Sequence, residues 1–169
     1  MAENKVLVRY PQIRDAERFY EIINNPNFIY ISIKVESVEA ERKWIRQRLI
    51  CRKMNIEWNY AILYNGELVG GIGIRINPYR NYVGEIGYFI DEKYWGMGIA
   101  TKAVKLVEKI GFRKLGLSRI EILMQPENKA SEKVAFKSGY WKEGLLRGIF
   151  IGRDGGKKDA LIYAKIKKD

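Results

Sequence analysis

The chain has 169 residues, a length typical of one domain and sufficient to bury a substantial core. It contains 31 Lys and Arg against 20 Asp and Glu, a formal net charge of +11, together with one cysteine and no histidine. These numbers exclude an internal disulfide, Ser-His-Asp or Cys-His catalysis and nearly all common zinc sites, so we predict no metal site.

The positive charge predicts an anionic ligand and disfavours a polycationic substrate. Lys and Arg are spread along the chain without a basic tail, so we expect no nucleic-acid partner; an ordinary solvated surface is the alternative interpretation. No apolar run approaches the ~20 residues that span a bilayer, and no signal-peptide core stands near the start. We therefore expect a cytoplasmic protein with no membrane partner. Without a histidine to activate it, Cys51 is not expected to act as a nucleophile.

The first part of the chain predicts one strand and two helices. Val6–Tyr10 has the composition of a strand and is followed by Pro11. Asp15 is placed to cap the first helix and Ser37 to cap the second. The predicted apolar positions are Phe19, Ile22 and Ile23 in the first helix and Trp44, Ile45 and Leu49 in the second.

A β-hairpin is predicted next. Residues 60–64 and 67–76 flank Asn65-Gly66, a pair typical of a type I′ turn. Residues 77–81 are predicted to form a loop, since Asn and Pro cluster there.

The most informative segment lies between a predicted strand, Val83–Ile90, and a predicted helix, Thr101–Ile110. It reads Trp95-Gly96-Met97-Gly98-Ile99-Ala100, and we call it the small-residue turn. Its low bulk lets a ligand approach the backbone closely. The first N–H groups of a helix lack partners and the dipole there favours negative charge, so the turn suits a phosphate or pyrophosphate. A tight strand-to-helix connection without a ligand is the alternative.

The last part predicts a strand over Arg119–Met124, a helix over Lys129–Ser138 capped by Asn128, and strands over 140–151 and 159–166. The order β-α-α-β-β-β-α-β-α-β-β predicts an α/β (α+β) fold with a mixed sheet and helices on both faces. A right-handed crossover would set the strand after the small-residue turn beside the strand before it. We expect residues 1–169 to form a single domain.

Several motifs, in their order and spacing, resemble those of the GNAT superfamily of acetyl-CoA-dependent N-acetyltransferases. The small-residue turn is similar to the family signature R/Q-x-x-G-x-G/A, with Trp95 in place of Arg or Gln. Trp at that site is familiar in the branch that includes ribosomal-protein N-terminal acetyltransferases. The other shared motifs are Gly84-Glu85-Ile86-Gly87-Tyr88, Pro126-Glu127-Asn128-Lys129-Ala130-Ser131, Lys137-Ser138-Gly139-Tyr140 and Glu143-Gly144-Leu145-Leu146-Arg147.

This resemblance covers nearly the whole chain and implies a mostly antiparallel central sheet in which two parallel strands splay apart, here Val83–Ile90 and Arg119–Met124. It implies acetyl-CoA as the cofactor, leaving as CoA, with its pantetheine arm between these strands and its pyrophosphate on the small-residue turn. The cofactor-binding residues that it implies are Phe89, Ile90, Trp95, Gly96, Met97, Gly98, Ile99, Ala100, Thr101, Asn128 and Ser131.

Glu85 is the first candidate for a catalytic residue. Its position resembles that of the strand glutamate that some histone acetyltransferases of the superfamily use as a base. A carboxylate can deprotonate an α-amine, whose pKa is near ~8. The alternative is a structural ion pair with Arg75, Arg80 or Arg119.

The sequence offers several candidates for the proton donor. Many family members have a tyrosine as general acid where this chain has Ala135. Ser131 is the catalytic candidate that could donate to the leaving sulfur, with water as the alternative; its hydroxyl could instead satisfy a helix N–H. Tyr88 and Tyr140 are aromatic alternatives, although strand tyrosines usually pack.

The resemblance places Phe28, Tyr30, Ile31 and Ile33 in one wall of the acceptor cleft, with core burial as the alternative. It predicts direct acetyl transfer in a ternary complex to a primary amine, most simply a protein N-terminal α-amine. A small-molecule amine is the alternative acceptor. A non-catalytic acyl-CoA-binding or nucleic-acid-associated module is the alternative of another class, and homodimer formation is left open.

Overall fold

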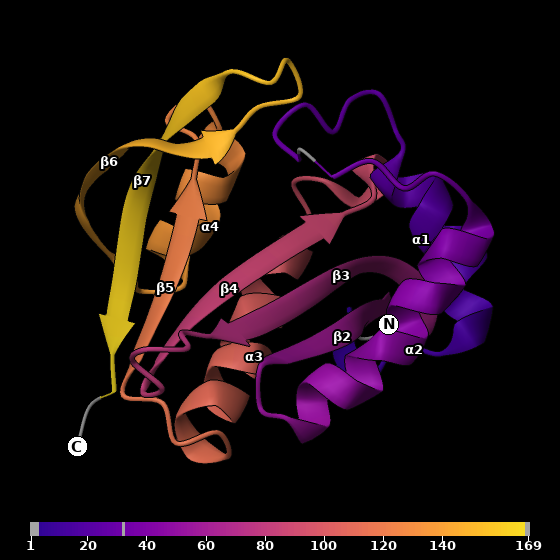
Figure 1. Ribbon diagram of the computed structural model, residues 1–169, viewed down its shortest axis with the longest axis horizontal. Helices are drawn as coiled ribbons and strands as arrows, with labels where there is room; N and C mark the ends of the chain where they lie inside the picture. Colours follow the sequence, from indigo (N-terminus) through magenta and orange to yellow (C-terminus); the bar gives the residue numbers. More distant parts are fainter. Residues whose placement is uncertain (1–3, 32, 168–169) are drawn as a thin grey trace.

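The computed structural model describes residues 4–31 and 33–167 (Figure 1). Within them, seven strands form one sheet in the order β1-β2-β3-β4-β5-β7-β6. The strands are β1 (Val6–Arg9), β2 (Glu57–Tyr64), β3 (Glu67–Ile76), β4 (Val83–Ile90), β5 (Arg119–Met124), β6 (Trp141–Ile151) and β7 (Lys157–Ile166). The helices are α1 (Ala16–Ile23), α2 (Val38–Lys53), α3 (Ile99–Arg113) and α4 (Lys129–Lys137), with 3-10 turns η1 (Ile13–Asp15) and η2 (Glu92–Tyr94).

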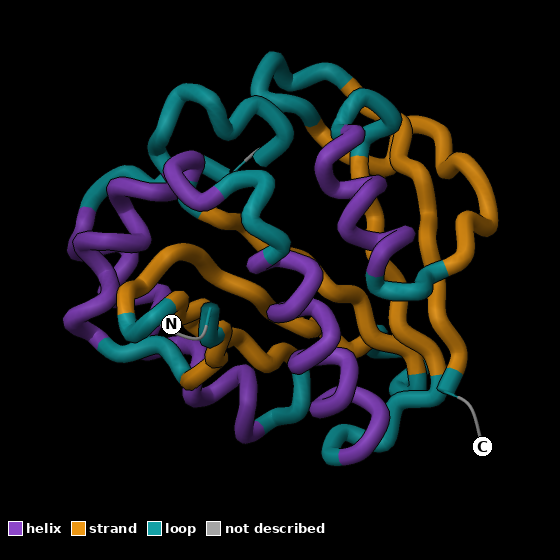
Figure 2. Tube along the Cα trace, turned by 180° about the vertical axis from the view of Figure 1, so that it is seen from behind, coloured by secondary structure: helices purple, strands orange, loops and turns teal. Residues whose placement is uncertain are grey.

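The predicted fold class is confirmed. β4 and β5 run parallel, whereas every other neighbouring pair in the sheet is antiparallel. Helices α1 and α2 cover one face of the sheet, and Figure 2 shows α3 and α4 on the opposite face. As predicted, α3 links β4 to a strand that lies beside it. Among the described residues, no helix combines the length and apolar character needed to cross a bilayer.

β4 and β5 are paired only where they begin. The register joins residues 83–85 to residues 119–121 and goes no further within the described part of the chain. Beyond this point β4 continues to pair with β3, while β5 continues to pair with β7. The two strands therefore diverge, as the opening between them in Figure 1 shows, and the predicted splayed pair is confirmed.

The core lies on both faces of the sheet. Under α3 and α4 it is built around side chains such as Ile74, Val104 and Ile120, all of them fully buried. A smaller cluster under α1 and α2 includes Phe19 and Ile45. α3 buries one stripe at helical spacing, which fixes its axis against the sheet and holds its first turn at the mouth of the opening.

Several local predictions are confirmed. Ser37 caps α2, since its hydroxyl accepts the N–H of Ala40 at 3.1 Å. Asn65 and Gly66 have φ values of 50° and 89°, the left-handed conformations that a type I′ hairpin turn requires.

Two local predictions are wrong. The Asp15 side chain does not cap α1. Asp15 is the last residue of the 3-10 turn η1, and its carboxylate binds Arg9 and the start of that turn instead. Its carboxylate lies 2.6 Å from Arg9 and accepts the backbone N–H of Gln12 at 2.7 Å. Leu49 is 47% exposed rather than buried, because α2 meets the sheet on a narrower stripe that contains Ile45.

Candidate active site

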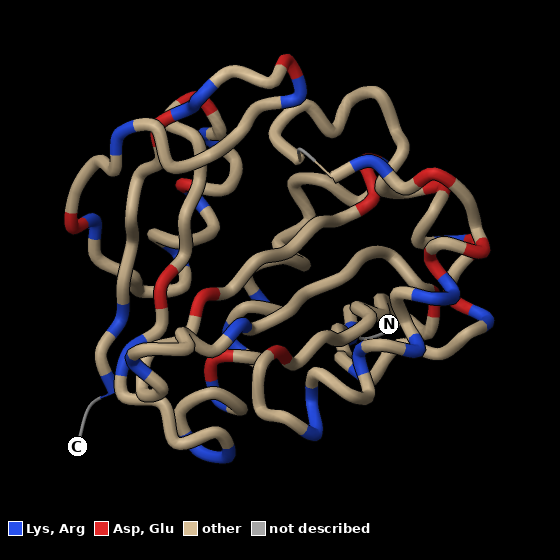
Figure 3. Tube along the Cα trace, viewed as in Figure 1, with Lys and Arg blue, Asp and Glu red and all other residues tan. Residues whose placement is uncertain are grey.

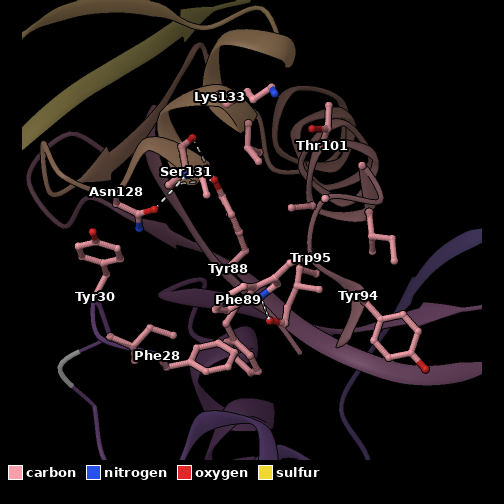
Figure 4. A pocket seen from close by; sticks show the side chains of 18 of the residues that line it. Phe28, Tyr30, Tyr88, Phe89, Tyr94, Trp95, Thr101, Asn128, Ser131 and Lys133 are labelled. Atoms are coloured by element: carbon pink, nitrogen blue, oxygen red, sulfur yellow. Dashed lines mark hydrogen bonds between the residues drawn. The ribbon is translucent and has the colours of Figure 1, made fainter. Parts of the chain in front are cut away.

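A cleft of about 460 Å³ lies between the end of β4 and helix α4, where β4 and β5 have diverged (Figure 4). Its walls come from the loop at residues 27–31, the end of β4, the small-residue turn and the first turns of α3 and α4. All of the predicted site residues except Glu85 and Met97 line this cleft. That they bind a ligand stays a prediction.

The small-residue turn has the geometry of an anion cradle. Gly96 and Gly98 have φ values of 77° and 75°, and a Cβ built on either would meet nothing within 4 Å. Helix α3 begins at Ile99, two residues before the predicted start, because Gly98 takes the left-handed N-cap position. Lys102 is the first residue whose N–H bonds back into the helix, to the oxygen of Gly98 at 3.1 Å. Among the described residues, the N–H groups of 96–101 have no recorded acceptor, so the cradle fits a phosphate group.

Two cations beside this cradle were missed by the sequence reasoning. Lys133 and Lys137 of α4 line the cleft and add positive charge there, and Figure 4 shows Lys133 on the wall across from Thr101 in the first turn of α3. Neither makes an ion pair with another described residue. Their spacing of four does place them on one helix face, but only the packing of α4 shows that this face borders the cleft.

The free edge of β4 has an internal partner. The Nε1–H group of Trp95 donates to the carbonyl oxygen of Ile90 at 2.6 Å. The indole also meets Phe28 edge to face, with ring centroids 5.7 Å apart. Trp95 therefore holds the small-residue turn against β4. Its hydrogen bond occupies one of the two acceptor sites of the Ile90 carbonyl oxygen, which was predicted to pair with pantetheine.

Three residues from β4 and α4 form a hydrogen-bonded group. The amide oxygen of Asn128 accepts the N–H of Ser131 at 3.1 Å, which confirms the predicted helix cap. The Ser131 hydroxyl lies 2.8 Å from the Tyr88 hydroxyl (Figure 4). Within the described chain this hydroxyl contacts no backbone N–H, so the alternative role of Ser131 receives no support. Burial raises the pKa of Tyr88 to about 12, although the Ser131 bond opposes the rise, so the phenol is protonated at neutral pH.

Glu85 lies outside the cleft, on the face of β4 that carries α1 and α2. Its side chain is exposed and stands in register with Arg75 on β3 and Glu121 on β5, and Figure 3 shows the two acidic positions of β4 and β5 side by side. Partial desolvation raises the pKa of Glu85 most; Arg75 opposes this rise, and nearby carboxylates add to it. A raised pKa favours a proton acceptor, provided that an amine can approach from this face.

Two of the three arginines predicted as ion-pair partners of Glu85 pair with other carboxylates. Arg75 lies 3.8 Å from Glu57, and Arg119 lies 2.6 Å from Glu121. Among the described residues, neither these two guanidinium groups nor Arg80 forms an ion pair with Glu85. Arg75 nevertheless stands in register with Glu85 and lowers its pKa, so the structural and the catalytic roles both stay predictions.

The loop after α1 forms part of the cleft. Phe28, Tyr30 and Ile31 line it, whereas Ile33 does not and is 67% exposed. Core burial, the predicted alternative, holds for Phe28 alone among these four residues. The Tyr30 hydroxyl donates to the carbonyl oxygen of Glu127 at 3.1 Å, so this loop reaches the segment before α4.

Known proteins resemble this chain over nearly its full length. Residues 5–140 match the family model described as Acetyltransferase (GNAT) domain. N-acetyltransferase YoaA of Bacillus subtilis is 30% identical over 168 residues, covering 97% of this chain and 94% of YoaA. The ribosomal-protein-serine acetyltransferase of Escherichia coli is 29% identical over 168 residues, covering 98% of this chain and 89% of the relative. Among solved structures, the microcin C7 self-immunity acetyltransferase MccE with acetyl-CoA and AMP has a TM-score of 0.87 and 26% identity, covering 98% and 94% of the two chains.

Proposed function

The chain belongs to the GNAT acetyltransferase family, and from that premise we propose that it moves an acetyl group from acetyl-CoA to a protein N-terminal α-amine. The observation that carries this proposal is the cleft beside the diverging strands, with unpaired backbone N–H groups at one end. A relative named for a ribosomal-protein serine substrate supports a protein acceptor. The structure of MccE, which contains acetyl-CoA, supports the cofactor.

Different residues of the cleft would bind different parts of acetyl-CoA. Acetyl-CoA, when bound, supplies a thioester whose acetyl carbon accepts the amine. The N–H groups of residues 96–101 would hold its pyrophosphate, with Lys133 and Lys137 adding charge. Phe89 and Ile90 would offer their backbone groups to the pantetheine arm, as a strand does to its neighbour. Asn128 and Ser131 lie on the opposite wall and would contact the arm and the thioester.

We infer direct transfer, because the chain has no histidine to activate a hydroxyl of the cleft, and its one cysteine, Cys51, is on α2 and does not line the cleft. The amine attacks the acetyl carbon, a C–N bond forms and the C–S bond breaks. Glu85, directly or through water, takes the amine proton, and the Ser131 hydroxyl donates a hydrogen bond to the departing sulfur. An α-amine with a pKa near ~8 is deprotonated at small cost, so a single carboxylate suffices.

A small-molecule amine is the second candidate acceptor. It is supported by the L-amino acid N-acetyltransferase AaaT of Escherichia coli, 24% identical over 166 residues. A non-catalytic acyl-CoA-binding or nucleic-acid-associated module is the proposal of another class. We further propose that residues 1–169 act as one domain in the cytoplasm. Whether they form a homodimer is decided by light scattering.

The test is a screen for CoA thiol release with acetyl-CoA, a library of peptide N-termini and a panel of small amines. Release that depends on peptides, with mass spectrometry locating acetyl on the α-amine, supports the first proposal. Release with small amines alone favours the second. Tight acetyl-CoA binding without turnover on any amine would leave only the non-catalytic module, and binding to RNA or DNA that acetyl-CoA does not change would identify its partner.

A further inference from the structure

A hydroxyl pair bridges the two walls of the cleft. Tyr88 is on β4 and Ser131 is on α4, 43 residues later, yet their hydroxyl oxygens are 2.8 Å apart. Figure 4 shows the two side chains directed toward each other, with Asn128 beside them. The position that carries a tyrosine in many family members holds Ala135, which is fully buried and brings no hydroxyl. The phenol that is hydrogen-bonded to Ser131 therefore comes from the opposite wall.

Either hydroxyl of the pair can be the donor, and the surroundings favour Tyr88. Besides the Ser131 hydroxyl, the one acceptor recorded near the Tyr88 phenol in the described chain is the Ser131 carbonyl oxygen, at a long 3.4 Å. The hydroxyl oxygen of Ser131, at 2.8 Å, is the nearer of the two acceptors for this partly buried phenol, which favours Tyr88 as the donor. The amide oxygen of Asn128 is already used by the Ser131 N–H. The proton of the Ser131 hydroxyl is then free to point into the cleft.

We propose that Tyr88 is a positioning residue that turns the Ser131 hydroxyl proton toward the sulfur of acetyl-CoA, an inference that rests on the function proposed above. Negative charge develops on that sulfur as the C–S bond breaks, and a donor already oriented stabilises it without reorganisation. A hydrogen bond received by the Ser131 oxygen also strengthens the one that it gives, since linked hydrogen bonds polarise each other.

The pair acts by hydrogen bonding rather than by proton transfer. The pKa of Tyr88 is raised to about 12 by burial, with the Ser131 bond opposing the rise. A thiol has a pKa near ~8.5, so a thiolate is too weak a base to take the phenol proton. The sulfur therefore receives its proton from solvent once the product has formed, and Tyr88 stays protonated throughout.

Other groups at the cleft also favour a thiolate. The charged side chains that line it are Lys133 and Lys137 of α4, and the remaining titratable ones are Tyr30 and Tyr94. None of them appears among the influences on the Tyr88 pKa. Glu132, the neighbour of Ser131, is engaged away from this pair by its ion pairs with Lys129 and Lys142 and by the Tyr163 hydroxyl. The contribution of the lysines is thus independent of Tyr88 and persists in its variants.

The test measures CoA affinity by calorimetry between about pH 6 and pH 10, across the ~8.5 pKa of a free thiol. Desulfo-CoA, which lacks the thiol, corrects for every other titrating group. If binding lowers the thiol pKa by about one unit, CoA gains about 10-fold in affinity over desulfo-CoA as the pH rises. We expect this gain to fall to about threefold or less in Tyr88→Phe and further in Ser131→Ala, where only the contribution of the lysines remains, in line with one hydrogen bond of ordinary strength.

Tyr163→Phe is the matched control, since it removes another phenol that bonds to α4, at Glu132 and 2.9 Å away. It should keep the full pH-dependent gain. A gain that survives in Tyr88→Phe, or that Tyr163→Phe loses equally, overturns the inference. CoA binding with this gain but no acetylation of any amine would refute the proposed function and leave the hydroxyl pair intact. Failure of the parent to bind CoA would refute both.

Activity gives a second readout. The value of kcat should fall several-fold in Tyr88→Phe while the KM for acetyl-CoA changes less than about twofold, because the lost bond acts mainly in the transition state. The double variant with Ser131→Ala should be no slower than Ser131→Ala alone. Multiplicative losses in the double variant would mean that Tyr88 acts independently of Ser131, contrary to the proposal.

Discussion

The two faces of the splayed strands are built differently. On the α3 and α4 face, the candidate cofactor site consists largely of backbone N–H groups fixed by a helix terminus and two left-handed glycines. The candidate acceptor site consists of side chains: an exposed Glu85 on the α1 and α2 face, and aromatic residues of the loop after α1 that line the cleft. Backbone recognition suits a ligand that does not change, whereas side chains on a loop are free to differ between acceptors.

The largest expected effect is on the backbone side. Gly98→Glu places a side chain and a negative charge where the pyrophosphate would lie, and it strains the left-handed N-cap. We expect CoA affinity to fall by roughly 100-fold or more, since juxtaposed like charges cost several kcal/mol. The matched control is Gly116→Glu: Gly116 has a φ of 70° with open space around its Cβ position and does not line the cleft. Equal CoA affinity in the two folded variants would refute the cradle.

The acceptor side is tested by Glu85→Gln. We expect kcat to fall roughly 10-fold or more at pH 7, because general-base assistance is typically worth ~10²–10⁴ and water recovers part of it. The loss should shrink as the pH rises through the pKa of the amine, near ~8. In the parent, desolvation is the main cause of the raised pKa of Glu85. Only the carboxylate form accepts a proton, so activity should be lost on acidification at a higher pH than it would be for an ordinary glutamate.

CoA affinity should be unchanged in Glu85→Gln, because Glu85 does not line the cleft. The melting temperature should also stay close to that of the parent, since no ion pair of Glu85 with another described residue is lost. A rate defect that is the same at every pH, together with a lower melting temperature, would remove Glu85 from the mechanism.

A smaller effect is expected from the side-chain charge that supplements the cradle. Lys133→Met should weaken CoA binding by about threefold to tenfold, and the difference from the parent should narrow in high salt because exposed charges are screened. Lys105→Met, on the exposed surface of α3 and away from the cleft, is the control and should bind CoA as the parent does. A loss as large as that of Gly98→Glu would mean that side chains, rather than backbone groups, dominate phosphate binding.

No effect is expected from Cys51→Ala, since Cys51 lies on α2 and does not line the cleft. Acetyl-CoA turnover should stay within about twofold of the parent, the range of ordinary surface substitutions. Mass spectrometry of the enzyme during turnover provides the check. An acetyl group on Cys51 that forms and decays fast enough to account for product would contradict direct transfer.

The same contrast separates what the sequence could and could not predict. The small-residue turn, the Ser37 and Asn128 caps and the Asn65-Gly66 hairpin depend on neighbouring residues, and they were predictable from local rules. The GNAT resemblance then supplied the splay of β4 and β5, which no local rule contains. Asp15 was misassigned because its partner, Arg9, belongs to another element.

Contacts between distant segments could not be predicted. The approach of Tyr88 to Ser131 depends on how α4 packs across the cleft, and so does the orientation of Lys133 toward it. The bond from Trp95 to the Ile90 carbonyl needs the coordinates of the turn itself. Residue types at these positions are common in helices and strands. Their spacing in the sequence therefore does not indicate that they meet at one cleft.

The crystal structure of the complex with CoA tests the central claim most directly. We expect the pyrophosphate oxygens within hydrogen-bonding distance of the N–H groups of residues 96–101, and the sulfur on the Ser131 side of the cleft with access to the face that carries Glu85. A CoA molecule whose pyrophosphate contacts other parts of the chain, or whose sulfur lies away from both Ser131 and the acceptor face, would contradict the assignment of this cleft as the site of acetyl transfer.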